Sequence, residues 1–245
     1  MINVLLNGAC GRMGREVEKL VESCDDFTLA ARVDKMTAES GCYNNFDDFD
    51  GKADVIIDFS NHLGTAELLD YAVKTNTPAV IATTGHTDDE LKLIEEASKK
   101  IAVFHSANMS LGVALLVELA KKTAEVMPDA DIEIVETHHN RKLDAPSGTA
   151  LMIANALKTV RENAKLILGR AGNTKRESGD IGIHAVRRGN IVGIHEVTVS
   201  TDNQTITLKH EAHSRALFAD GAISAARFII GKPAGLYEMN SIVEA

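Results

Sequence analysis

The chain has 245 residues, of which 44% are hydrophobic and 25% are charged, and its formal net charge is -9 at pH 7. This composition is typical of a soluble globular protein, and the length allows one or two domains with a buried core. The acidic balance argues against general nucleic-acid binding, because neutralising phosphates requires a concentrated basic surface. A small anionic ligand would therefore need a local basic cluster.

The three cysteines, Cys10, Cys24 and Cys42, are widely spaced and odd in number. This pattern predicts free thiols in a reducing compartment rather than a disulfide framework or a zinc site. The sequence starts with an apolar, strand-like run and has no basic leader, and no apolar stretch approaches the roughly 18 residues of a membrane span. We therefore expect a cytoplasmic protein.

The first hundred residues alternate short apolar runs with helical patterns. Strands are predicted over 2–6, 27–33, 55–59, 78–82 and 101–105, and helices over 12–24, 64–75 and 88–99. Continuous apolar strands that alternate with helices are typical of a parallel sheet covered on both faces. We expect an α/β domain of the Rossmann type, with a doubly wound parallel sheet.

The pattern changes after residue 109. A long helix is predicted over 110–126, a strand over 131–137 and a helix over 149–160, followed by strands over 182–187, 191–200 and 205–211 and a last helix over 216–230. Strands that cluster after helices and alternate polar with apolar residues predict a second, smaller α+β domain with a mixed sheet.

A glycine cluster, Asn7-Gly-Ala-Cys-Gly-Arg-Met-Gly14, separates the first strand from the first helix. Its GxxGxxG spacing departs from the usual GxGxxG fingerprint, and glycine clusters alone are more often plain turns. Here the cluster opens a helix whose N-terminal N–H groups suit a pyrophosphate. Asp34 follows Gly14 by 20 residues, at the end of the second strand, where a carboxylate accepts from ribose hydroxyls. The context predicts a dinucleotide site.

Lys35 bears on which dinucleotide is bound. An acidic residue alone favours NAD, whereas an adjacent cation holds the 2′-phosphate of NADP. Arg12 in the glycine cluster is a second candidate cation. The pair Asp34-Lys35 predicts that NADH and NADPH are both usable, and the alternative is that Lys35 is a solvated loop lysine.

Two later segments follow predicted strand ends and are expected to lie at the same dinucleotide site. Thr83-Thr84-Gly85 follows the fourth predicted strand and Ser106-Ala107-Asn108-Met109 follows the fifth. Small hydroxyl residues and an asparagine there are suited to the nicotinamide ribose or carboxamide. Each segment alone is more often a plain turn or a helix cap.

A basic segment follows the strand predicted over 131–137 and contains His138, His139, Arg141 and Lys142. Ser147 is the expected N-cap of the next helix, so the N–H groups of Gly148 and Thr149 are placed to hold a carboxylate. We expect no metal here, because adjacent strand residues point to opposite faces and no further ligand set is near. Acid–base chemistry on an anionic substrate fits better than a solvated loop with one histidine capping the strand.

These residues carry a resemblance to a known family. Residues 136–150 (ETHHNRKLDAPSGTA), GACGRMGRE near the N-terminus and residues 106–113 (SANMSLGV) closely resemble 4-hydroxy-tetrahydrodipicolinate reductase, long called dihydrodipicolinate reductase. The similarity runs over essentially the whole chain, including RALFADG at 215–221. Two departures are Ala82, where a glycine is common, and Ile194, where an acidic residue usually precedes His195.

The resemblance implies a cytoplasmic homotetramer that reduces 4-hydroxy-tetrahydrodipicolinate, a small dicarboxylate, with NADH or NADPH in the diaminopimelate route to lysine. No nucleic acid or membrane partner is implied. Residues 1–109 and 216–245 would form the dinucleotide-binding domain, and residues 110–215 the substrate-binding and tetramerisation domain.

The resemblance also implies residue roles. His138 would be the general acid/base and Lys142 a proton donor, while His139, Gly148 and Thr149 would bind the substrate. The cofactor site would comprise Gly8, Ala9, Cys10, Gly11, Arg12, Met13, Asp34, Lys35, Ala82, Thr83, Thr84, Ser106, Ala107, Asn108 and Met109.

Two other functions stay open on the residues alone. One is a different two-domain NAD(P)-dependent dehydrogenase that acts on a small anionic amino or hydroxy acid. The other is a non-catalytic dinucleotide sensor, which would leave the pair His138 and Lys142 without an explanation. Without the resemblance, the residues indicate only a nicotinamide oxidoreductase of a small anionic substrate.

Overall fold

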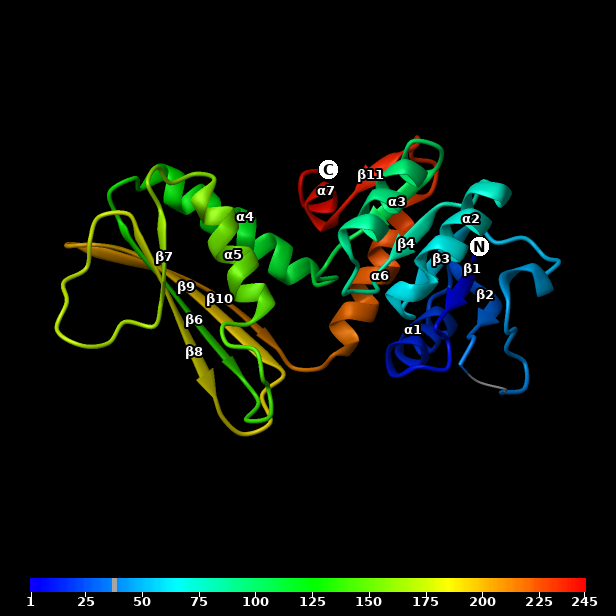
Figure 1. Cartoon of the computed structure of the whole chain (residues 1–245), viewed down its shortest axis with the longest axis horizontal. Coiled ribbons are helices and arrows are strands. Elements are labelled where there is room, and N and C mark those ends of the chain that lie inside the picture. The colour runs from blue at the N-terminus through cyan, green and yellow to red at the C-terminus, as the bar shows by residue number, and fades with distance from the viewer. Residues whose placement is uncertain (37–38) are drawn as a thin grey trace. The chain divides into compact units, whose positions relative to one another are not determined.

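The computed structural model describes residues 1–36 and 39–245, and the chain folds into two units (Figure 1). The first unit comprises Met1–Leu111 together with Ala216–Ala245, and the second comprises Gly112–Arg215. Within the described residues, none of the helices is long and apolar enough to cross a membrane.

Six parallel strands form the sheet of the first unit, in the order β11-β5-β4-β3-β1-β2. Their bounds are Ile2–Asn7 (β1), Phe27–Val33 (β2), Val55–Asp58 (β3), Ala79–Ile81 (β4), Ala102–His105 (β5) and Gly235–Tyr237 (β11). β3 and β4 are buried along their whole length, as expected for strands between two helical layers, and all their residues except Asp58 are apolar. The strand order reverses at β1, and sheets of this type bind ligands at the carboxyl ends of the strands beside that point.

Helices cover both faces of this sheet (Figure 1). α1 (Arg12–Ser23) and α6 (Ala216–Ile229) pack against each other on one face, and α2 (Thr65–Thr75) and α3 (Asp88–Ser98) pack on the opposite face. α1 buries Val17 and Val21, which are one helical turn apart. The predicted doubly wound domain is confirmed.

The second unit contains a mixed sheet of five strands, in the order β10-β9-β6-β8-β7. Their bounds are Asp131–His138 (β6), Lys165–Leu168 (β7), Asp180–Arg187 (β8), Gly193–Thr201 (β9) and Gln204–Ala212 (β10). β6, β8 and β7 are parallel, whereas β9 is antiparallel to both β6 and β10. The predicted α+β domain with a mixed sheet is confirmed.

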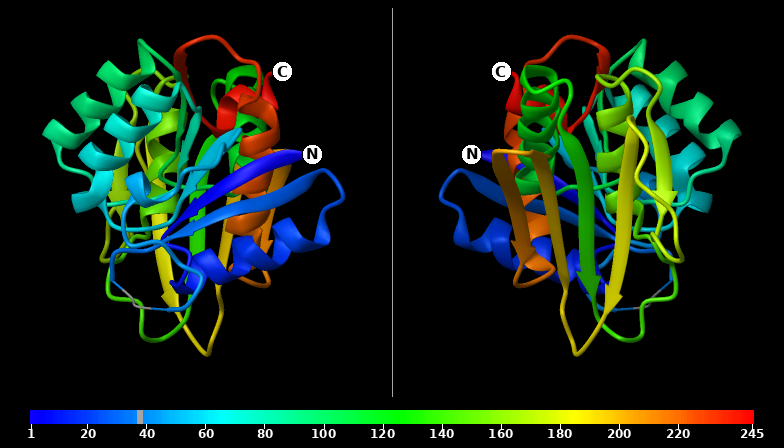
Figure 2. Two further views of the ribbon diagram at one scale, coloured as in Figure 1. Left: turned by 90° about the vertical axis from the view of Figure 1, so that its right-hand side faces the viewer. Right: turned by 90° about the vertical axis from the view of Figure 1, so that its left-hand side faces the viewer.

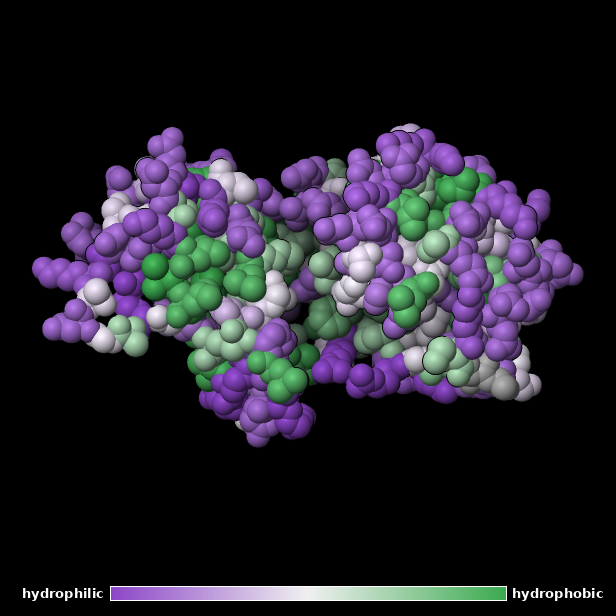
Figure 3. Space-filling model, viewed as in Figure 1, coloured by the Kyte–Doolittle hydropathy of each residue, from purple (hydrophilic) through white to green (hydrophobic). Residues whose placement is uncertain are grey.

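α4 (Leu111–Val126) and α5 (Gly148–Lys158) lie on one face of this second sheet, and the right-hand view of Figure 2 presents the other face. Ile132 and Ile134 of β6 alternate with half-exposed residues and pack with Leu116 of α4 and Ile153 of α5 in one core. Apolar side chains also reach the surface where α5 lies (Figure 3).

Three short elements were not predicted from the sequence: β7, β11 and α7 (Met239–Val243). Each has at most five residues, which is too few for either a two-residue or a 3.6-residue periodicity to show. Two single-turn 3-10 helices, Phe46–Asp48 (η1) and His62–Gly64 (η2), were not predicted for the same reason.

Candidate functional site

The glycine cluster forms the turn between β1 and α1. Gly8 has φ 75°, and a Cβ there would lie 2.5 Å from the carbonyl oxygen of Phe59, so this position requires glycine. A Cβ on Gly14 would lie 2.2 Å from the carbonyl oxygen of Gly8, so its absence lets α1 pack against the turn. Gly11 is the N-cap of α1 and provides no side-chain cap, which leaves the first-turn N–H groups for an anion.

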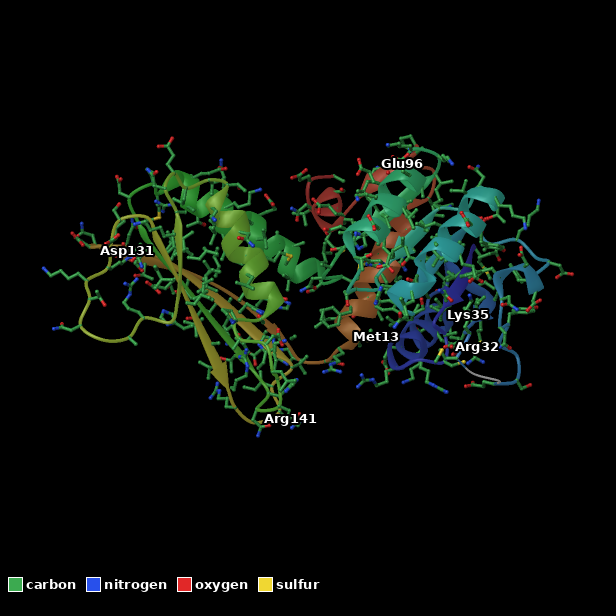
Figure 4. All side chains as sticks on the ribbon, in the orientation of Figure 1. Met13, Arg32, Lys35, Glu96, Asp131 and Arg141 are labelled. Carbon is green, nitrogen blue, oxygen red and sulfur yellow. The ribbon has the colours of Figure 1, made fainter. Side chains whose placement is uncertain are left out.

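Asp34 holds this turn from the end of β2. Its Oδ2 accepts from the N–H of Cys10 (3.1 Å) and its Oδ1 accepts from the N–H of Met36 (2.9 Å). The ammonium of Lys35 forms an ion pair with Glu67 of α2, and both side chains are nearly half exposed. Such an exposed pair contributes about 0–1 kcal/mol, so a phosphate would compete for Lys35 at little cost. Figure 4 shows Arg32 and Lys35 close to each other along this part of the chain.

Asp58, at the end of β3, is a residue of this site that the sequence reasoning missed. Its buried carboxylate accepts from Asn7 Nδ2 (2.7 Å) and from the hydroxyl of Ser60 (2.6 Å). Burial raises the pKa of Asp58 in spite of these hydrogen bonds. The carbonyl oxygen of Asp58 also accepts from the N–H of Ala82 (2.9 Å). Asp58 therefore links the end of β1 to the segment that follows β4.

The other predicted cofactor residues lie at the carboxyl ends of β4 and β5. Ala82 and Thr83 are buried directly after β4. After β5, the Ser106 hydroxyl donates to the carbonyl oxygen of Asn108 (2.8 Å), and Asn108 Oδ1 accepts from the N–H of Ser110 (2.9 Å). Because β1, β3, β4 and β5 are parallel, their carboxyl ends gather all these segments at one edge of the first sheet.

A second group of chemically active residues lies in the second unit, around the end of β6. His138 is the last residue of β6 and Glu136 precedes it on the same side of the strand. The Nδ1 of His138 is 2.6 Å from Oε2 of Glu136, and the guanidinium of Arg187 binds both oxygens of the carboxylate at 2.7 and 2.8 Å. Burial by itself raises the pKa of Glu136. Hydrogen bonds from Arg187 and His138 outweigh this effect and hold that pKa below its usual value.

The N-terminus of α5 joins the same cluster through Ser147. The N–H of Ser147 donates to Oε1 of Glu136 (3.0 Å), and its hydroxyl accepts from the N–H of Ala150 (3.2 Å), as the predicted N-cap. The same hydroxyl lies 3.2 Å from Nε2 of His195, whose ring centroid is 5.2 Å from that of His138. The second unit thus places the end of β6 and the start of α5 in one hydrogen-bonded group.

Lys142 lies in the loop between β6 and α5. Its ammonium is 2.8 Å from Oδ1 of Asp144, and this contact, together with a hydrogen bond from the N–H of Gly148, holds the pKa of Asp144 below its usual value. The loop therefore already holds one carboxylate between an ammonium and the N-terminus of α5. Arg141, the residue before Lys142, lies at the tip of the loop, at the opposite end of β6 from Asp131 (Figure 4).

His139 and His195 are both held toward the neutral form. Burial lowers the pKa of His139, and the charges of Arg141 and Arg215 lower it further. Burial, followed by the charge of His138, lowers the pKa of His195 to about 4. The charge of Lys142 also contributes to lowering the pKa of both histidines.

The pKa of His195 predicts an acid-sensitive stability. A histidine titrates near 6.5 when unfolded but near 4 here, so the unfolded chain binds the proton first as the pH falls. We expect about 3 kcal/mol of unfolding free energy to be lost between about pH 6.5 and pH 4. Urea denaturation of wild type and His195→Gln at pH 7 and 4.5 measures this. Equal losses in both proteins would show that His195 is not responsible.

Glu136, Arg187, His195 and Asp144 are the members of the second group to which the sequence reasoning gave no role. Glu136 and Asp144 are local to the basic segment, since Glu136 stands two residues before His138 on a predicted strand and Asp144 stands two residues after Lys142. Arg187 and His195 lie about fifty residues away, and nothing local in the sequence connects them to His138.

Comparisons with known proteins also match the chain in two parts, and the second part extends beyond the second unit into α6 and β11 of the first unit. The family model for the N-terminus of dihydrodipicolinate reductase matches residues 2–109, and the model for its C-terminus matches residues 112–243. A 4-hydroxy-tetrahydrodipicolinate reductase of Caldanaerobacter subterraneus subsp. tengcongensis is 47% identical over 248 residues, covering 100% of this chain and 99% of that protein. The reductase of the same name from Clostridium novyi is 42% identical, with the same coverage.

A solved structure agrees with these sequence matches. The dipicolinate-bound dihydrodipicolinate reductase from Paenisporosarcina sp. TG-14 superposes with a TM-score of 0.80 at 25% identity, covering 97% of each chain.

A doubly wound dinucleotide-binding domain followed by a mixed-sheet domain defines a two-domain oxidoreductase of the pyridine-nucleotide-dependent class. Within that class, the chain belongs to the dihydrodipicolinate reductase family, because family models cover nearly all of it and full-length relatives exceed 40% identity.

Proposed function

We propose that this chain catalyses the NADH- or NADPH-dependent reduction of 4-hydroxy-tetrahydrodipicolinate to tetrahydrodipicolinate, in lysine biosynthesis by the diaminopimelate pathway. The observation that carries the proposal is the full-length, 47% identical match to a reductase of that name. Within that match, residues 136–150 carry the motif that resembles the same family.

The first unit has the features that a nicotinamide dinucleotide requires. Gly11 leaves the start of α1 without a side-chain cap, and a pyrophosphate would accept from the N–H groups there. Asp34 would accept from a ribose hydroxyl, and the segments after β4 and β5, residues 82–84 and 106–109, would line the nicotinamide end. When bound, the dihydronicotinamide supplies the hydride.

The second unit has the features that a dicarboxylate requires. The chain carries a net charge of -9, yet Lys142 and the start of α5 already hold the carboxylate of Asp144. A substrate carboxylate would displace Asp144 and accept from Gly148 and Thr149, with His139 as a further ligand. His138 would act as general acid/base, and Lys142 would donate the proton that the ring takes up after reduction.

The proposal is tested by a coupled assay with freshly made dihydrodipicolinate-synthase product. We expect the absorbance of both NADH and NADPH to fall, each measured separately at saturation. A panel of amino and hydroxy acids with NAD and NADP is the control for a different dehydrogenase. Turnover on that panel, and none with the synthase product, would overturn the proposal.

Use of both cofactors predicts a specific role for Lys35. Replacing Lys35 with alanine is expected to weaken NADPH binding about tenfold and to leave NADH binding unchanged, because only NADPH has the 2′-phosphate. Glu67→Gln is the matched control, since it releases Lys35 from its ion pair and should strengthen NADPH binding. Isothermal titration with each cofactor measures both effects, and equal losses for NADH and NADPH in Lys35→Ala would exclude this role.

We further propose a cytoplasmic homotetramer that associates through the face of the second sheet opposite α4 and α5. Strand register places Val135, Val186 and Ile194 together on that face, which gives it an apolar part. All three cysteines are free thiols, in keeping with a reducing compartment.

A further inference from the structure

Glu136 is completely buried, and its carboxylate has a donor at every available position. Oε2 is contacted by His138 Nδ1 (2.6 Å) and Arg187 Nη1 (2.8 Å), while Oε1 is contacted by Arg187 Nη2 (2.7 Å) and Ser147 N (3.0 Å). An ionised carboxylate has about four acceptor sites, so these four contacts fill it. Burying an ionised carboxylate this deeply is unfavourable unless an opposite charge and hydrogen bonds compensate for the lost hydration.

Strand register brings this group together. His138 of β6 lies opposite Arg187 of β8, and Glu136 of β6 lies opposite His195 of β9. Because side chains alternate along a strand, Glu136 and His138 point to the same face of the sheet, and β6 itself lies between β8 and β9. Ser147 is added by the loop that leads into α5. The arrangement of Glu136, His138, Arg187 and His195 is therefore set by the pairing of the sheet.

We infer that Glu136 is the positioning residue of the reaction: it fixes the tautomer of His138 and ties that histidine to the start of α5. An ionised carboxylate only accepts hydrogen bonds, so the hydrogen between Glu136 and His138 must belong to Nδ1. The other ring nitrogen, Nε2, then becomes the one that exchanges protons with substrate. The kinetic part of this inference rests on the proposed function, whereas the tautomer does not.

The surroundings of Nε2 agree with this assignment. A Cβ on Gly193 would lie 3.0 Å from His138 Nε2, so the glycine leaves space beside that nitrogen. Arg187 neutralises the carboxylate, and its Nη2 also donates to the carbonyl oxygen of Asp144 (2.6 Å). The same ion pair thus orients the histidine and holds the loop that carries Lys142.

The first test is the tautomer itself, which needs no turnover. In protein labelled with 15N-histidine, two-bond nitrogen–proton correlations at about pH 9 distinguish Nδ1–H from Nε2–H, and a His138→Asn sample assigns the signal. We expect Nδ1–H for His138 in the wild type. Nε2–H in the wild type would overturn the inference, whatever the variants do.

The second test is Glu136→Gln. The amide oxygen is expected to stay with the N–H of Ser147, which can only donate, so the NH2 group faces His138 and forces its ring to Nε2–H. The kcat is expected to fall roughly 100-fold, because a wrongly protonated acid–base group loses most of its contribution. The KM for NADH is expected to stay within about threefold.

Asp180→Asn is the matched control. Asp180 is also buried and accepts from an arginine, Arg170, and from a backbone N–H, that of Glu177, but it begins β8 whereas Arg187 ends that strand. Its kcat is expected to stay within about threefold of wild type, with His138 still Nδ1–H. A purely structural role for Glu136 would give both variants the same kcat and leave the His138 tautomer unchanged in both, which would overturn the inference.

Discussion

Replacing either His138 or Lys142 with alanine is expected to lower kcat by roughly 100-fold or more, the usual contribution of a positioned acid–base group. His138 is the last residue of β6, and its Nδ1 is hydrogen-bonded to Glu136. Lys142 lies in the loop that follows β6. The two groups share the proposed protonation step, so the double variant should lose much less than the product of the two single losses. Steady-state kinetics with the synthase product and NADH measure all three proteins.

Arg141→Ala is the control for charge alone. Arg141 is the cation next to Lys142, but it is exposed and bonds only to Asn140 and Asn190 among the side-chain contacts of the described residues. Its removal is expected to leave kcat within about threefold. If His138→Ala and Lys142→Ala also stay within about threefold, the proposed acid–base assignment is wrong.

Replacing Arg187 with methionine is expected to cost about 3 kcal/mol of unfolding free energy in the second unit. The variant leaves the fully buried carboxylate of Glu136 without its counter-ion, and an uncompensated buried charge is far costlier than a lost surface pair. The 18% exposure of the arginine side chain places the effect at the lower end of the range for buried pairs. Urea denaturation followed by far-UV circular dichroism measures the loss.

Two companion variants separate charge from packing. Lys165→Met removes an ion pair with Glu177 in which both partners are more than 60% exposed, and it should cost less than about 1 kcal/mol. Glu136→Gln combined with Arg187→Met removes both charges and should recover much of the loss seen with Arg187→Met alone. A double variant no more stable than Arg187→Met would mean that the arginine acts through packing.

The class of fold follows from the sequence because its signals are local. Runs such as 55–57 and 79–82 are apolar without interruption, as strands between two covering layers are, and 131–137 alternates as a one-sided strand does. The short strands β7 and β11 were missed because they are stabilised by pairing with β8 and β5 rather than by a pattern of their own, and the five residues of α7 are too few to show a helical period.

The candidate sites divide in the same way. The glycine cluster with Asp34, and the run from His138 to Thr149, are contiguous or regularly spaced, so the sequence by itself is enough to predict a dinucleotide site and an anion site there. The cations at and beside the basic segment are paired with carboxylates. Lys142 forms an ion pair with Asp144, and Arg187 forms one with Glu136.

Only the tertiary structure decided what orients those groups. Asp58 accepts a hydrogen bond from Asn7, and Arg187 binds Glu136. In the sheet, His138 lies opposite Arg187 and Glu136 lies opposite His195. All these contacts join residues about fifty or more positions apart in the chain. Which strands are neighbours, and in which register, depends on the packing of the whole sheet against its helices. A shift of one residue would turn Arg187 to the opposite face and leave Glu136 unpaired.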